Sequence, residues 1–117
     1  QAQRSFRSGL EPAEKEMARD PRNGVVRSRL AYLCAKLGDR NRAESEIAQA
    51  LQSSPGDAAT RDMAVRTYDA LDKRGDAIAI LASSSDDVLA NVLRSPDLAG
   101  FRDDVRFQQL LTTRQIK

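Results

Sequence analysis

The stretch Lys36-Leu37-Gly38-Asp39-Arg40-Asn41-Arg42-Ala43 (KLGDRNRA) lies between two runs of residues that favour helix. Gly38 is suited to end the first helix, because the residue after the last helical turn often takes a left-handed conformation that glycine adopts without steric cost. Asp39 is suited to begin the second helix, because its carboxylate can accept hydrogen bonds from the free amides of the first turn. A link this short predicts two antiparallel helices.

Apolar side chains on both sides of this turn recur every three or four residues, as expected for one face of a helix. They are Val26, Leu30, Leu33 and Leu37 before the turn, and Ala43, Ile47, Ala50 and Leu51 after it. Asn23 is the expected cap of the first of these helices. The chain lacks the runs of alternating Val, Ile, Thr and aromatic residues that are typical of strands. We therefore predict an all-α fold.

A second pair of helices repeats the plan, with Asp57 as its expected cap. We predict a break near Lys73 to Gly75, and the glycine of this second turn is displaced to Gly75 from the position of Asp72. Pro55 suits the link between the two pairs, since its fixed φ and missing N–H end a helix. The apolar faces of this pair are Met63, Ala64, Tyr68 and Leu71 on one helix and Ala77, Ile80 and Leu81 on the other.

Similar residues recur 34 positions apart, at Pro21 and Pro55, Leu37 and Leu71, Ala43 and Ala77, and Ile47 and Leu81. That period, with the pattern W-x2-L-G-x2-Y, then A-x3-F, then P, is typical of the tetratricopeptide repeat (TPR). The first unit reads Arg27-x2-Leu30-Ala31-x2-Cys34, then Ala43-x3-Ile47, Ala50 and Pro55. The second unit reads Arg61-x2-Ala64-Val65-x2-Tyr68, then Ala77-x3-Leu81. The chain therefore resembles the TPR family, with Arg in both units where the family usually has Trp.

The last part of the chain resembles an ending seen after TPR arrays in bacterial signalling proteins such as multidomain serine/threonine kinases. The residues that carry this resemblance are Pro96, Asp97, Leu98, Phe101, Arg102, Asp104, Arg106, Phe107, Leu110 and Leu111. We expect Asp86 or Asp87, then Ser95, then Asp103 to cap the short helices of this region.

The TPR resemblance implies an α-α superhelix of antiparallel helix pairs with a C-terminal helical cap, in a single compact domain. Such units cannot bury their apolar faces alone and must stack on their neighbours. The expected organisation is a remnant helix of an upstream repeat at 1–23, a first unit at 24–57, a degenerate second unit at 58–91 and the helical cap at 92–117. Pro12 suits the first turn of the remnant helix.

Composition limits the class of function. The 117 residues include 19 basic and 17 acidic residues, largely interleaved, which indicates solvated helix faces and gives no nucleic-acid footprint. No apolar run approaches the roughly 18 residues of a membrane span, and the charged start of the chain lacks the apolar core of a signal peptide. We therefore expect a soluble chain without membrane insertion, with a cytoplasmic location favoured over a periplasmic one.

An enzymatic function is not expected. The chain has no His, which removes the usual general base and zinc ligand, and its glycines are dispersed where a phosphate-binding loop needs them clustered. The adjacent carboxylates at Asp86-Asp87 and Asp103-Asp104 are interpreted as helix caps. The single Cys34 excludes an internal disulfide and is interpreted as a packed side chain. We predict no catalytic residue, no metal and no cofactor.

The TPR resemblance also implies a concave inner face that is formed by the first helix of each unit and that holds a peptide. Its inward positions are Val25, Ser28, Arg29, Tyr32, Ala35 and Lys36 in the first unit, and Ala59, Asp62, Met63, Arg66, Asp69 and Ala70 in the second. From these we predict the partner-binding residues to be Ser28, Arg29, Tyr32, Lys36, Asp62, Met63, Arg66 and Asp69.

Two kinds of contact are expected from that set. The cations Arg29, Lys36 and Arg66 would pair with an acidic partner. Tyr32 and Met63 would supply adaptable apolar contact. The alternative is that these side chains are simply the solvated polar positions of a scaffold. Binding of a chaperone's C-terminal carboxylate, known for some TPR domains, is not implied, because Lys and Asn are replaced at key positions.

The expected partner is therefore a protein or peptide, and a homo-oligomer is a further candidate, within a larger bacterial signalling or assembly protein. A basic helical nucleic-acid-binding domain and a self-association module remain alternatives. The first is favoured by a sequence pI of about 9.0 and by Arg-rich helices, and it would be identified by salt-sensitive oligonucleotide binding.

Overall fold

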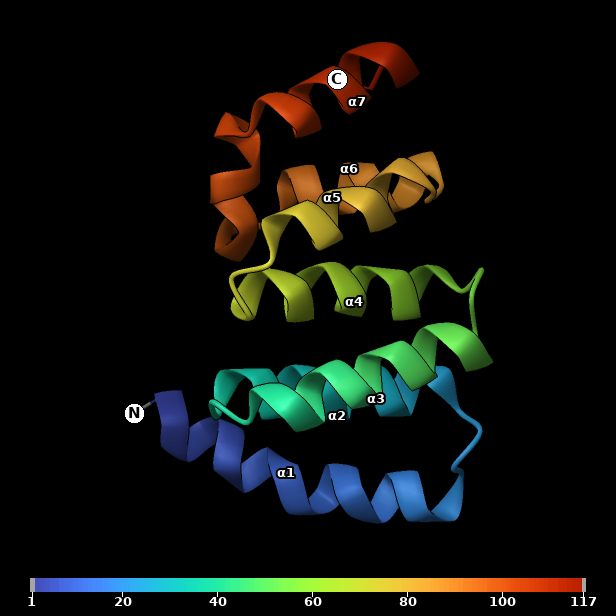
Figure 1. Cartoon of the computed structure of the whole chain (residues 1–117), viewed down its shortest axis with the longest axis vertical. Helices are drawn as coiled ribbons and strands as arrows, with labels where there is room; N and C mark the ends of the chain where they lie inside the picture. The colour runs from blue at the N-terminus through green and yellow to red at the C-terminus, as the bar shows by residue number, and fades with distance from the viewer. Residues whose placement is uncertain (1, 117) are drawn as a thin grey trace.

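The computed structural model describes residues 2–116, with side chains from Arg7 onward. Its helices are α1 (Ala2–Arg19), α2 (Gly24–Lys36), α3 (Arg40–Ser53), α4 (Ala58–Ala70), α5 (Arg74–Ala82), α6 (Asp86–Arg94), the 3-10 helix η1 (Pro96–Asp103) and α7 (Val105–Arg114). No strand occurs between residues 2 and 116. The helices stack in chain order along the longest axis of a body of 41 × 31 × 21 Å (Figure 1). The predicted all-α, repeat-like fold is confirmed.

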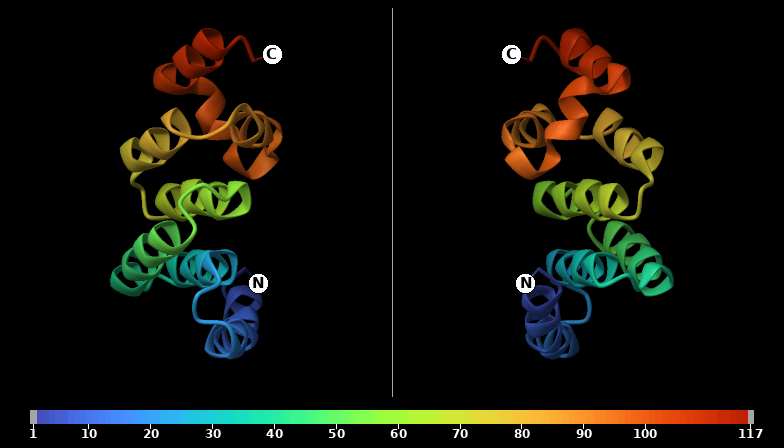
Figure 2. Two further views of the ribbon diagram at one scale, coloured as in Figure 1. Left: turned by 90° about the vertical axis from the view of Figure 1, so that its right-hand side faces the viewer. Right: turned by 90° about the vertical axis from the view of Figure 1, so that its left-hand side faces the viewer.

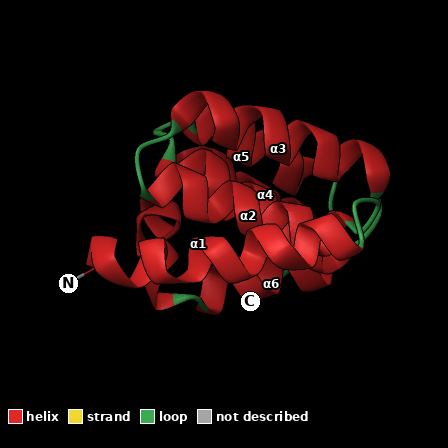
Figure 3. Ribbon diagram, turned by 90° about the horizontal axis from the view of Figure 1, so that it is seen from below, coloured by secondary structure: helices red, strands yellow, loops and turns green. Residues whose placement is uncertain are grey.

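The stack has two layers. The helices α2, α4 and α6 lie on one side, while α3, α5 and α7 lie on the other (Figure 2). The view from below shows α3 and α5 together, on the opposite side from α2 and α4 (Figure 3). Because short turns join the helices of each pair, the three helices of the first layer run in the same direction.

The turn at KLGD ends α2 as its sequence predicts. Gly38 has a φ of +86°, in the left-handed region that favours glycine. Its N–H donates to the Ala35 carbonyl at 3.2 Å, and the Asp39 N–H donates to the Cys34 carbonyl at 2.9 Å. These two bonds make a Schellman motif, which satisfies carbonyls that the helix end would otherwise leave free.

The second turn has the same pair of hydrogen bonds without a glycine. The Asp72 N–H donates to the Asp69 carbonyl at 3.0 Å, and the Lys73 N–H donates to the Tyr68 carbonyl at 2.8 Å. Asp72 takes the left-handed position with a φ of +63°, which Asp tolerates better than most residues. The break predicted near Lys73 to Gly75 lies too late in the chain, because α4 ends at Ala70 and Gly75 lies within α5.

Three of the predicted helix caps are confirmed. The side chains of Asn23, Asp39 and Asp57 each accept hydrogen bonds from backbone amides two or three residues further on. Each bond satisfies an amide that has no partner within its own helix.

Two of the caps predicted for the last helices, at Asp86 or Asp87 and at Asp103, are displaced. Ser85 precedes α6, so that Asp86 and Asp87 lie within its first turn, where carboxylates favour the positive end of the helix dipole. Asp104, and not Asp103, caps α7, and its carboxylate accepts a hydrogen bond from a backbone amide. In both places the sequence offers adjacent polar residues, and their spacing alone does not select between them.

The first helix also begins earlier than its proline suggests. Pro12 lies inside α1 and not in its first turn. Its side chain is exposed, so the ring contacts solvent and not the packed face. On the opposite face, Met17 is buried in the same apolar cluster as Val26 and Leu30 of α2.

Small side chains pack between the layers. No part of Ala31, Ala43, Ala50, Ala64 or Ala77 is exposed. A methyl side chain lets two helix backbones approach closely, so these positions fix the spacing of the paired helices. The larger apolar cluster lies further along the chain, under the cap.

Two aromatic rings organise that cluster. Phe101 of η1 and Phe107 of α7 are fully buried and meet edge to face, with centroids 5.8 Å apart. The Arg74 guanidinium of α5 lies 4.4 Å from the centroid of the Phe101 ring. This contact between a cation and an aromatic face joins α5 to the C-terminal helical cap.

The arginines at the usual Trp position have matching roles in the two units. Arg27 donates to the Pro21 carbonyl at 3.1 Å and to Glu46 of α3 at 2.5 Å. Arg61 donates to the Pro55 carbonyl at 2.6 Å and also reaches α5. Each arginine therefore joins the link before its pair to the second helix of that pair.

Candidate functional site

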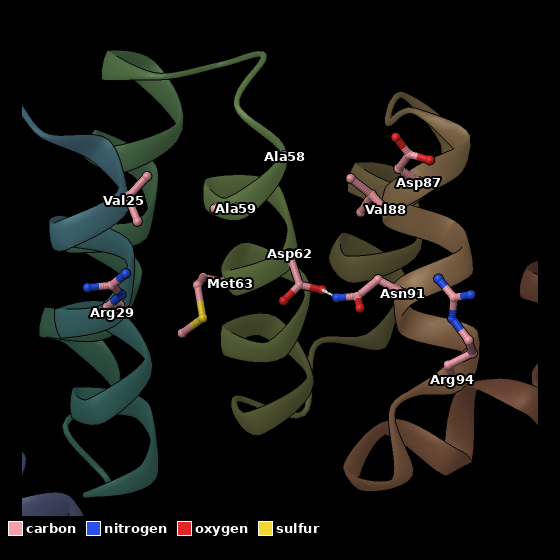
Figure 4. Close-up of a pocket in the computed structure, with 10 residues that line it drawn as sticks. All are labelled: Val25, Arg29, Ala58, Ala59, Asp62, Met63, Asp87, Val88, Asn91 and Arg94. Atoms are coloured by element: carbon pink, nitrogen blue, oxygen red, sulfur yellow. Dashed lines mark hydrogen bonds between the residues drawn. The ribbon is translucent and has the colours of Figure 1, made fainter.

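A hollow of about 510 Å³ opens on the face formed by α2, α4 and α6 (Figure 4). The first halves of α2 and α4 contribute to it, together with one side of α6. Its lining residues are Val25, Arg29, Ala58, Ala59, Asp62, Met63, Asp87, Val88, Asn91 and Arg94.

The third wall of this hollow comes from α6, which continues the spacing of the first-layer helices at a shorter interval. Ala59 lies one full repeat period after Val25, whereas Val88 follows Ala59 five positions sooner than that period would place it. The difference of five equals the difference in length between α3, with 14 residues, and α5, with nine. The unit boundary expected between residues 91 and 92 falls inside α6, so this helix belongs as a whole to the wall of the hollow.

The acidic side chain in the middle of the hollow is already paired. One oxygen of Asp62 accepts a hydrogen bond from the Arg66 guanidinium at 2.9 Å, and the other accepts one from the Asn91 amide at 3.0 Å. Arg66 also pairs with Asp97 at 2.6 Å and donates to Ser95 at 2.7 Å. This network holds α6 and η1 against α4. Ser95, which precedes η1 as expected, uses its hydroxyl in the network and not as a helix cap.

Three charged side chains of the hollow have no hydrogen bond or ion pair among the residues that the structure describes. They are Arg29 on α2, Arg94 on α6 and Asp87 at the start of α6. All three are exposed, and Figure 4 shows the two guanidinium groups on opposite walls. Their charges are therefore available to a partner.

The remaining lining is small or apolar and lies mainly at the end where the helices begin. Val25, Ala59 and Val88 come from the three walls in turn, and Ala58 adds a second methyl group on α4 (Figure 4). Met63 lies deeper along α4, between Arg29 and Asp62 (Figure 4). The hollow thus has an apolar end and a charged end.

Of the eight predicted partner-binding residues, the structure brings Arg29, Asp62 and Met63 together in this hollow. Ser28 faces away from it, since its side chain is fully buried and its hydroxyl donates to the Val25 carbonyl at 2.7 Å.

The other four predicted residues lie outside the lining. Arg66 donates a hydrogen bond to Asp62, which lines the hollow. Asp69 pairs with Arg74 at 3.1 Å, at the far end of α4. On α2, the Lys36 ammonium lies 5.6 Å from the centre of the Tyr32 ring.

The lining residues on α6 escaped the sequence prediction, as did Ala58. A comparison at the fixed offset of 34 runs past α6, because α6 begins only 28 residues after α4. The pattern that could have found it is the polar row Asp87, Asn91 and Arg94, whose spacings of four and three place it on one helix face.

The described residues offer little reactive chemistry. No group of three or more His, Cys, Asp and Glu side chains that could hold a metal ion is found among them. Burial raises the pKa of the Cys34 thiol, which keeps it protonated and weakly nucleophilic near neutral pH. Within residues 2–116, no helix has the length and apolar character that crossing a membrane requires.

Comparison with known proteins gives no match for this chain among protein-family models, curated proteins or solved structures. A function is therefore inferred from the residues of the hollow and their geometry.

Proposed function

We propose that this chain is a TPR-like scaffold for protein-protein interaction, which binds a peptide segment of a partner protein across α2, α4 and α6. The observation that carries the proposal is the convergence of three parallel helices on one hollow with both apolar and unpaired charged side chains. Its volume of about 510 Å³ is sufficient for a few side chains of a bound segment. The chain would supply this contact within a larger bacterial signalling or assembly protein.

The exposure of the lining favours a peptide over a small molecule. Arg29, Ala58, Ala59 and Arg94 are all exposed, so the hollow faces solvent along its walls. Small-molecule sites enclose most of their ligand, whereas repeat arrays present extended concave surfaces to long partners.

The distribution of arginine weighs against the nucleic-acid alternative. Six arginines pair with carboxylates of this chain, namely Arg27, Arg42, Arg66, Arg74, Arg106 and Arg114. Much of the basic charge is therefore neutralised within the molecule. A titration with single-stranded and duplex oligonucleotides at low salt should show no salt-sensitive binding.

Selection from a random library of displayed twelve-residue peptides tests the proposal. The selected peptides should bind the unaltered chain and should lose binding to Ala59→Trp, because the indole ring would fill the hollow. Ala48→Trp is the matched control, since Ala48 is exposed on α3 in the other layer. If the peptides bound Ala59→Trp and the unaltered chain equally, the hollow would not be the binding site.

A further inference from the structure

We propose that the groove selects partner segments that carry acidic side chains close to an aliphatic one, with one carboxylate bound by Arg29 and another by Arg94. This inference rests on the proposed function and adds the chemistry of the ligand. The groove is the hollow described above, with its apolar end at the start of the three helices.

The positive charges of the groove are the ones left without a partner. Both carboxylate oxygens of Asp62 are occupied, by Arg66 and by Asn91. Arg29 and Arg94, in contrast, have no hydrogen bond or ion pair to any described residue. A carboxylate from a partner would therefore meet two free guanidinium groups, whereas a partner cation would find Asp62 already neutralised.

The positions of the two arginines suit two acidic side chains of one bound segment, one at each wall. Arg29 lies on α2 and Arg94 on α6, on opposite walls, with Met63 and Asn91 between them (Figure 4). Guanidinium groups bind carboxylates through paired N–H donors, so each wall can contribute a directed, charge-assisted bond. A segment that crosses the groove would thus be held from both sides.

The apolar end of the groove sets the second requirement. Val25, Ala59 and Val88 form a row across the three walls, and the small side chain of Ala59 leaves space at its centre. An aliphatic side chain would be buried there, which is favourable because apolar surface is removed from water. An acidic side chain would not be favoured at that end, because Asp87 has the same charge.

Asp87 therefore gives the groove a direction. Its position in the first turn of α6 is stabilised by the helix dipole, so its negative charge has a structural role as well. A bound segment should place its aliphatic residue near Asp87 and an acidic residue near each of Arg29 and Arg94. A C-terminal carboxylate is not required, since an internal Asp or Glu meets the same need.

The peptides selected above provide the test, when they are synthesised with amidated C-termini and measured by fluorescence anisotropy. They should be enriched in Asp or Glu within a few residues of Leu, Ile or Val. Arg29→Glu combined with Arg94→Glu should weaken their binding at least about tenfold, because repulsion replaces attraction on both walls. Arg29→Gln with Arg94→Gln should weaken it less, and Asp87→Asn should strengthen it.

Arg19→Glu combined with Arg22→Glu is the matched control. It makes the same change in charge at two exposed arginines that do not line the groove, and it should alter binding less than about twofold. Circular dichroism of each variant should be unchanged, because the substituted side chains are exposed.

Four results would overturn the inference. Selected peptides that depend on Ala59 but lack acidic residues would show that the groove binds peptides without selecting acidic ones. Equal binding of the selected peptides to the unaltered chain and to the Arg29→Glu, Arg94→Glu variant would show the same. A library without any peptide that distinguishes the unaltered chain from Ala59→Trp would overturn both proposals. A dimer in sedimentation that Ala59→Trp dissociates would assign the groove to a second copy of the chain.

Discussion

The two helix pairs have the same turn geometry but differ in the residues that form the turn and cap the second helix. In the first pair, Gly38 takes the left-handed position of the turn and Asp39 caps the second helix. In the second pair, Asp72 takes the left-handed position, and Lys73 precedes a helix without a side-chain cap. The backbone hydrogen bonds of the turn are nevertheless the same, so the geometry of a repeat persists after the residues that favour it have changed.

The pairs also differ in the length of the outer helix, and this difference shapes the groove. The five residues that α5 lacks relative to α3 correspond to about 7.5 Å of helix. Only the layer of α3 and α5 is shortened, because α2 and α4 have the same length of 13 residues. The next helix of the layer of α2 and α4 is α6, which forms the third wall of the groove.

The largest expected effect is a loss of stability that distinguishes the cores of the two helix pairs. Leu81→Ala should lower the free energy of unfolding by about 2–5 kcal/mol, because Leu81 is fully buried and its loss leaves a cavity. Since Leu81 shares a cluster with Phe101 and Phe107, amide exchange in α7 should also become faster. Chemical denaturation and hydrogen exchange measure the two effects.

Ile47→Ala is the counterpart in the first pair, at the matching position one repeat period earlier. Ile47 belongs to a separate cluster, so a similar loss of stability should leave α7 protected. Equal acceleration of exchange in α7 by both variants would mean that the two pairs unfold as one unit.

A smaller effect is expected where α2 begins. An added Cβ at Gly24 would lie 2.4 Å from Ser54 Oγ and 3.0 Å from the Ala50 carbonyl oxygen. Gly24→Ala should therefore lower the free energy of unfolding by about 1–3 kcal/mol. The second pair already has Ala58 at this position, and Ala58→Gly should cost no more than about 1 kcal/mol. Urea denaturation that found Gly24→Ala neutral would show that α3 can move away from α2.

The two turns should respond in opposite directions. Gly38→Ala should lower the free energy of unfolding by about 1–2 kcal/mol, because an alanine is strained at a φ of +86° although no atom lies within 4 Å of its Cβ. Asp72→Gly should raise it by up to about 1 kcal/mol, because glycine relieves the same strain. Thermal unfolding measures both, and a loss of stability in Asp72→Gly would show that the aspartate side chain supports the turn.

The smallest effect concerns acid. The hydrogen bond from the Arg106 side chain holds the pKa of Asp104 below its usual range. Its ionised form therefore stabilises the fold above the unfolded pKa of about 3.9, and this stability is lost as the pH falls through the folded value. Thermal midpoints of the unaltered chain should fall between pH 6 and pH 3 more steeply than those of Asp104→Asn. Parallel curves would remove Asp104 as a source of acid sensitivity in the cap.

Local rules in the sequence predict much of this fold. The caps Asn23 and Asp57 and the turn at Gly38 follow from the hydrogen-bonding capacity and backbone freedom of single residues. The turn at Asp72 does not follow from such rules, because the packing of two helices imposes a left-handed conformation on an aspartate although a glycine lies three positions away.

The candidate site was less predictable, for a related reason. Arg29 and Met63 were found because they occupy matching positions in two successive units. Asn91 and Arg94 were missed because α6 begins less than one repeat period after α4, so a comparison at the offset of 34 does not align the two helices. The pairing of Arg66 with Asp97 depends on η1, whose position the sequence pattern does not give.

The equivalent caps that begin the two helix pairs have a consequence for protein engineering. Asn23 and Asp57, which occupy equivalent positions in the repeat, begin the two pairs with the same kind of side-chain cap. A second copy of residues 24–57 inserted after Asp57 would therefore meet compatible ends on both sides. Such an insertion would lengthen the groove by one wall while leaving the short α5 to end it, so the chain is suited to building recognition surfaces of chosen length.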